Sequence, residues 1–98
     1  MSLREELMRY FDSPAITVGL LRDGLELAAP GYERQPLPRT DGRIEGRVTF
    51  GPFPKLTRLN EVVLFDGDEV VESLYKLNEV LPLPPGAEFA HDMGIDLL

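Results

Sequence analysis

Hydrophobic and polar positions alternate along most of the chain, in short segments separated by turn signals. Between residues 43 and 50, Ile44, Val48 and Phe50 fall on one face of an extended strand, with charged and hydroxyl side chains on the other. This period of two predicts a half-buried strand. The apolar run at 62–65 predicts a central strand of the core. This central strand is expected to span 61–66. Further strands are expected at 15–21, 25–28, 32–37 and 69–77, with a last pair at 87–91 and 95–98.

Four dipeptides mark the expected turns: Asp23-Gly24, Asp41-Gly42, Asp66-Gly67 and Pro85-Gly86. Asp-Gly is typical of type I′ hairpin turns, because both central residues of that turn need a positive φ. Short strands with regularly spaced turns are typical of antiparallel sandwiches. We therefore predict a mainly β fold, an antiparallel β-sandwich or jelly-roll-like sheet pair over residues 14–98.

The first segment has a helical period instead. Leu3, Leu7 and Phe11 recur on one side of residues 1–13, and charged residues occupy the other side. The segment opens with a capping box and ends before Pro14, whose predecessor is disfavoured in a helix. We expect one short N-terminal amphipathic α-helix, which either docks on a partner or covers the open end of the sandwich.

Composition and charge narrow the function. The 98 residues fit one domain, and they include no cysteine, which excludes disulfides and Cys-ligated zinc. No signal-peptide pattern and no apolar run of ~20 residues is present, so we expect a soluble protein without a membrane partner. Residues 61–98 carry nine acidic side chains against one basic, whereas residues 1–60 carry eight against nine. The acidic part repels phosphate backbones, so no nucleic-acid partner is expected. Few Asn and Gln residues and nine prolines favour a thermophilic source.

No enzyme signature occurs in the chain. Asp92 could orient His91, the sole histidine, but no serine is placed near them, and we interpret His91 as a surface or strand-edge residue. The acidic run at 66–69 lacks EF-hand spacing and also has the composition of a hairpin tip. We expect no catalytic residue, no cofactor and no metal site.

Tyr32 and Arg34 form the most distinctive polar and aromatic stretch. Both residue types are favoured in interface hot spots, so they could bind a partner. Alternatively, Arg34 pairs with an acid on a neighbouring strand while Tyr32 closes the core. Phe53, between two prolines, is the aromatic residue expected to be exposed. The candidate partner-interface residues are Leu3, Leu7, Phe11, Tyr32, Arg34 and Phe53.

Several features follow one another in a fixed order after the first helix: the strand Ile16–Leu20, the G-Y-x-R-Q segment Gly31–Gln35, a strand ending at Phe50, the L-F-D turn in Val63–Gly67, and the segments Gly86–Phe89 and Ile95–Leu97. This order resembles a family of small virion structural proteins of tailed bacteriophages, often labelled tail-fibre or minor structural proteins. The chain departs from the family in a shorter loop at 22–30 and in having no tryptophan before the L-F-D strand.

The resemblance implies a non-enzymatic component of a phage virion, assembled in the host cytoplasm and placed on the tail, neck or capsid surface. Its partners would be copies of itself and other virion proteins. The uneven charge would let near-neutral and acidic surfaces of different copies pack into a ring or lattice. The alternatives are a capsid decoration protein, or a carbohydrate-binding module of a phage fibre that holds a host-surface glycan on exposed rings such as Phe53. A small hydrolase comes third.

Overall fold

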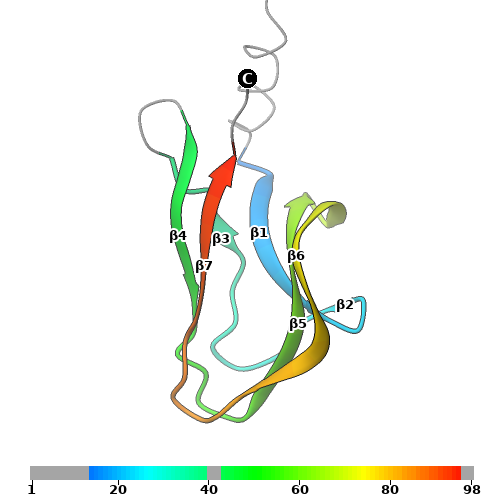
Figure 1. Cartoon of the computed structure of the whole chain (residues 1–98), viewed down its shortest axis with the longest axis vertical. Coiled ribbons are helices and arrows are strands. Elements are labelled where there is room, and N and C mark those ends of the chain that lie inside the picture. The colour runs from blue at the N-terminus through cyan, green and yellow to red at the C-terminus, as the bar shows by residue number, and fades with distance from the viewer. Residues whose placement is uncertain (1–13, 40–42, 96–98) are drawn as a thin grey trace, which may run out of the picture.

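The computed structural model describes residues 14–39 and 43–95, which form seven β-strands and no helix (Figure 1). Every pairing between these strands is antiparallel. The mainly β fold is therefore confirmed, whereas the predicted N-terminal helix lies outside the described residues. The strands are β1 (Ile16–Arg22), β2 (Leu25–Glu26), β3 (Gln35–Pro36), β4 (Ile44–Phe50), β5 (Thr57–Asp66), β6 (Glu69–Leu83) and β7 (Phe89–Ile95).

The strands form two sheets that share one hydrophobic core. In the larger sheet the order is β2-β1-β5-β6, and β3 also pairs with β1. The smaller sheet consists of β4 and β7 (Figure 1). The main core draws side chains from both sheets, among them the fully buried Val18, Leu20, Phe50 and Val62. A smaller buried cluster, Leu21, Val63 and Phe65, comes from the alternate residues of β1 and β5.

Three of the four predicted turns lie among the described residues, and one of them is shifted in register. Pro85 and Gly86 form the predicted turn before β7, where the Ala87 N–H donates to the Pro84 carbonyl at 3.1 Å. Asp23 and Gly24 connect β1 to β2 with φ of 51° and 85°, which fits the predicted type I′ turn. Between β5 and β6 the two loop residues are Gly67 and Asp68, and only Gly67 has a positive φ, of 60°. This turn is therefore of the II′ kind and lies one residue later than predicted. The Asp41-Gly42 turn lies outside the described residues.

The C-terminal strands differ from their predicted bounds. β6 extends to Leu83 instead of ending at 77, and its fifteen residues face ten in β5. Three register shifts absorb the difference, so β6 is a strongly bulged strand at the edge of its sheet. The predicted break between residues 91 and 95 is wrong, because residues 89–95 form the single strand β7, paired with β4 along its length. Residues 96–98 of the second predicted strand lie outside the described residues.

Phe53 lies in the core, and the expectation of an exposed ring is wrong. Its side chain is 0% exposed, while the flanking Pro52 and Pro54 lie at the surface. The Phe53 backbone also pairs with the turn before β7: its N–H donates to the Ala87 carbonyl (2.9 Å), and its carbonyl accepts from the Gly86 N–H (2.6 Å). The prolines thus hold the chain at the surface while the ring between them points inward.

Candidate functional site

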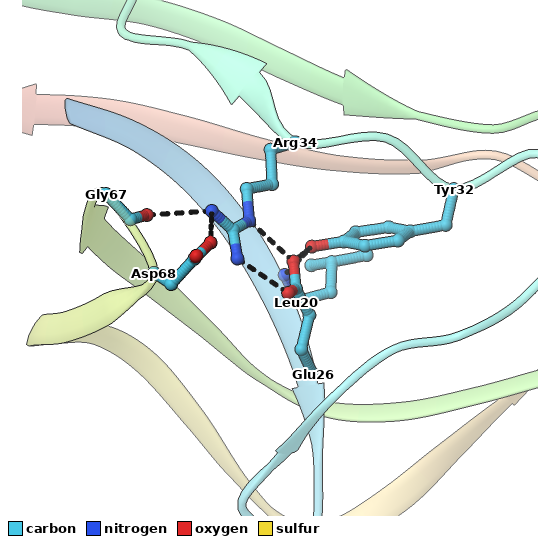
Figure 2. A network of polar contacts seen from close by, with 6 residues as sticks. All are labelled: Leu20, Glu26, Tyr32, Arg34, Gly67 and Asp68. Atoms are coloured by element: carbon cyan, nitrogen blue, oxygen red, sulfur yellow. Dashed lines mark hydrogen bonds and ion pairs between the residues drawn. The ribbon is translucent and has the colours of Figure 1, made fainter. Parts of the chain in front are cut away.

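The densest group of polar contacts lies on the edge of β1 that faces away from β5, in the gap between its pairings with β3 and β2. β3 pairs with β1 at Thr17 and Val18, and β2 pairs with it at Leu21 and Arg22. Between these pairings, the Leu20 N–H donates to the Tyr32 hydroxyl (3.2 Å; Figure 2). A side chain therefore satisfies a backbone group that the interrupted strand pairing leaves open.

Glu26, at the end of β2, binds both of the residues that the sequence singled out (Figure 2). The Tyr32 hydroxyl donates to Glu26 Oε2 at 2.6 Å. Arg34 donates through Nε to Oε2 and through Nη2 to Oε1, both at 2.7 Å. This is the bidentate arrangement of guanidinium and carboxylate, the stronger kind of charged hydrogen bond. The predicted pairing of Arg34 with an acid on a neighbouring strand is confirmed.

The opposite side of the Arg34 guanidinium reaches the turn between β5 and β6. Nη1 donates to the Gly67 carbonyl at 2.7 Å and lies 3.1 Å from Asp68 Oδ1. The guanidinium carbon also lies 3.9 Å from the centre of the Phe65 ring, a cation–π contact. Asp68 is 98% exposed, so its ion pair adds little, and the bonds to Glu26 and Gly67 hold the side chain. Arg34 thus ties its own loop to β2 and to the β5–β6 turn.

The protonation of this cluster is fixed around neutral pH. The hydrogen bonds from Arg34 hold the pKa of Glu26 below its usual value, against the opposing effect of burial. Burial, followed by the hydrogen bond to Glu26, raises the pKa of Tyr32. Glu26 therefore stays a carboxylate and Tyr32 a neutral phenol, which suits a structural contact. Neither group is poised to exchange a proton in the way general acid–base catalysis requires.

The raised pKa of Tyr32 makes stability sensitive to alkali. The hydroxyl ionises more easily in the unfolded chain, so its contribution is fully present below about pH 10 and is lost as the pH rises further. We expect the free energy of unfolding to fall less steeply above about pH 10 in Tyr32→Phe than in the wild type. Urea unfolding at a series of pH values measures this slope. Parallel slopes in the two proteins would contradict the raised pKa.

Gly19 leaves the room that the cluster needs. A Cβ built on it would lie 2.8 Å from the Tyr32 hydroxyl oxygen and closer still to the Phe65 ring. Gly19→Ala should therefore force both rings to move and cost about 1–2 kcal/mol, as overpacking does. Gly94→Ala is the matched control, since a Cβ there would meet no atom within 4 Å. The prediction is checked by thermal unfolding of the two variants, and equal melting temperatures would contradict it.

The other chemical candidates do not assemble into a site. Asp92 pairs with Arg47 (2.8 Å), and His91 lies against the Tyr75 ring with 6.0 Å between ring centres. The depression beside His91 and Asp92 has a volume of about 230 Å³, which is smaller than the roughly 300–1,000 Å³ usual for ligand pockets. Across residues 14–39 and 43–95, no three His, Asp or Glu side chains are grouped so as to hold a metal ion. The same residues include no helix of the length and apolar character that crossing a bilayer needs.

The structure therefore brings together two of the six predicted interface residues. Tyr32 and Arg34 meet at Glu26, Phe53 lies in the core, and Leu3, Leu7 and Phe11 lie outside the described residues. Glu26 was missed because an acid between two leucines in a short strand carries no motif of its own.

Comparison of the chain with models of protein families, with curated proteins and with solved structures finds no match to any of them.

Proposed function

We propose that this chain is a non-enzymatic structural component of a tailed-phage virion and acts through contacts with other proteins. The virion assignment rests on the resemblance in the order of the sequence features. The observation that carries the action through protein contacts is the outer edge of β6, which no strand of the described residues covers. Val70, Val71 and Tyr75 are exposed along it. Large exposed apolar side chains gathered on a strand edge are typical of a protein-contact surface.

The chemistry of the polar cluster supports a non-enzymatic role. Glu26, Tyr32 and Arg34 bind one another and the backbone of the sheet, and their charges do not change around neutral pH. Their polar groups hold the loop instead of facing a ligand. An interface role for Tyr32 and Arg34 would use only their outer atoms, because both side chains are partly buried.

The shared core supports a small β-sandwich as the finer description of the fold. Phe50 of β4 and Met93 of β7 belong to the same buried cluster as Val18 of β1 and Val62 of β5. Small antiparallel sandwiches are rigid and have two ends and two edges to offer to neighbours, which suits a part of a particle. Copies of the chain and other virion proteins are its proposed partners, and the virion is its proposed location.

The carbohydrate-binding alternative loses the residue on which it depended. Glycan sites of this kind present exposed aromatic rings, and the Phe53 ring is buried.

The virion proposal is tested by mass spectrometry of purified particles from the phage that encodes the chain. Hundreds of copies per particle would place it on a capsid or tail-tube lattice, and about three to twelve at a neck, baseplate or fibre. Its absence from the particles would overturn the proposal.

A further inference from the structure

Two exposed patches of opposite charge lie at opposite ends of the β5–β6 hairpin. The first, which we call the acidic edge, is residues 69–75 at the start of β6. The second, which we call the basic end, is residues 55–58, where the chain enters β5. Figure 1 shows the turn that leads into β6 at the upper end of the molecule and the start of β5 at the lower end.

The acidic edge combines carboxylates with exposed apolar side chains. Glu69 and Glu72 are exposed and form no ion pair with any described residue, and the patch contains no basic side chain. Between them lie Val70 and Val71, followed by Tyr75, with exposed fractions of 43%, 41% and 50%. Two of the register shifts between β5 and β6 fall in this stretch, and such bulges hinder the addition of a regular strand. A partner would therefore bind mainly to the side chains.

The basic end has the complementary composition. Leu56 is 51% exposed, and the exposed Lys55 and Arg58 flank it. Neither cation forms an ion pair with a described residue, in contrast to Arg22, Arg34 and Arg47, each of which has a carboxylate within 4 Å. The two patches together contain four of the five large apolar side chains that are exposed in the described part of the chain.

The patches cannot meet within one molecule. Glu72 of the acidic edge lies opposite Leu64 in β5, six residues from Arg58, so the nearest opposite charges of the two patches are roughly 20 Å apart at about 3.3 Å per residue. An acidic edge facing a second acidic edge would bring like charges together, which disfavours that contact. The remaining arrangement sets the acidic edge of one copy on the basic end of the next.

We propose that copies of this chain associate head to tail, with the acidic edge (69–75) of one copy bound to the basic end (55–58) of its neighbour. Apolar contacts of Val70 and Val71 with Leu56 would form the centre, and the charges of the two patches, Glu69 and Glu72 against Lys55 and Arg58, would surround it. Such a heterologous contact gives a ring when the rotation closes and a filament when it does not. The inference rests on the proposed function, because it identifies the second copy among the partners of a virion component.

Charge reversal tests the contact, with the full chain as the sample. One variant carries Lys55→Glu with Arg58→Glu, and the other carries Glu69→Lys with Glu72→Lys. Each variant alone sets like charges against each other at every contact, so we expect association at least about tenfold weaker than in the wild type. Mixed in equal amounts, the variants make every contact between opposite charges, and assembly should return. Sedimentation velocity measures the mass, and raising the salt from about 0.05 to 0.5 M should weaken wild-type assembly.

A control double variant, Glu33→Lys with Glu88→Lys, makes the same change in net charge as Glu69→Lys with Glu72→Lys, at exposed positions outside both patches. It should assemble with itself as the wild type does. All the substituted side chains are exposed, and circular dichroism verifies that each variant is folded. A wild type that stays monomeric at every concentration, or a mixture that fails to reassociate, would overturn the inference.

The two experiments, mass spectrometry of particles and sedimentation of the purified chain, separate this inference from the proposed function. A chain that is found in purified particles but stays monomeric in solution would retain the virion role and lose the head-to-tail contact. A chain that assembles with the expected charge dependence but is absent from particles would retain the contact and lose the virion role.

Discussion

Replacing Phe53 by alanine should lower the free energy of unfolding by about 3–5 kcal/mol, the range usual for loss of a buried aromatic ring. The ring is 0% exposed and belongs to the main core. Its backbone is bonded on both sides to the turn before β7, at Gly86 and Ala87. The loop is therefore held in place and cannot collapse to fill the cavity. Urea unfolding followed by far-ultraviolet circular dichroism measures the loss.

Leu25→Ala is the control. Leu25 is 76% exposed and lies outside both patches, so its removal should change the free energy of unfolding by no more than about 0.5 kcal/mol. A similar small effect for Phe53→Ala would mean that the Phe53 ring lies at the surface, as the sequence predicted. It would also restore the exposed ring on which the carbohydrate-binding alternative depended.

Strands that are buried on one face, or on both, were predictable from the order of residues. The segment 43–50 was predicted from its alternation, and β4 occupies 44–50 with Ile44, Val48 and Phe50 buried. The apolar run at 62–65 is buried throughout and lies in the second half of β5, which has β1 on one side and β6 on the other. In these segments each side chain's environment is determined by the face it occupies, so the local pattern carries the information.

The edge strand and the last strand were not predictable in the same way. β6 is exposed along most of its length, and the register shifts against β5 insert extra residues that interrupt any alternation. The two strands predicted at 87–91 and 95–98 left Asp92, Met93 and Gly94 between them. These three residues instead pair with Arg47, Gly46 and Glu45 of β4, which are more than forty positions away in the chain. The pattern of neighbouring residues therefore does not indicate that this segment pairs with a strand so distant in the sequence.

The polar cluster was half predictable for a similar reason. Tyr32 and Arg34 were predicted as candidate interface residues because of their residue types. One of the two interpretations paired Arg34 with an acidic residue on a neighbouring strand. The identity of that acid depends on how the β1–β2 hairpin lies beside the loop that carries Tyr32, which is a tertiary arrangement. The gap in strand pairing that Tyr32 fills, at Leu20, also exists only in the folded sheet.

Glu26→Ala should lower the free energy of unfolding by about 2–3 kcal/mol, because it removes three hydrogen bonds, two of them to a charged partner. It would leave the Arg34 guanidinium and the Tyr32 hydroxyl partly buried with fewer acceptors. The control is Asp92→Ala, which breaks the exposed ion pair with Arg47 and should leave the free energy of unfolding almost unchanged. The side chains of Glu26 and Arg34 are 31% and 26% exposed, against 73% and 66% for Asp92 and Arg47.

The effect of Glu26 should disappear in acid. The pKa of Glu26 is lowered in the folded chain, so its stabilising contribution is present above the ordinary glutamate pKa of about 4.3 and is lost as the pH falls through the lowered value. The difference in stability between the wild type and Glu26→Gln should therefore be constant near pH 7 and shrink below about pH 4. A double-mutant cycle with Arg34→Ala isolates the pair, and additive losses at pH 7 would show that Glu26 and Arg34 act independently. A coupling that is large at neutral pH and small in acid is the outcome that an ionised, bidentate contact requires.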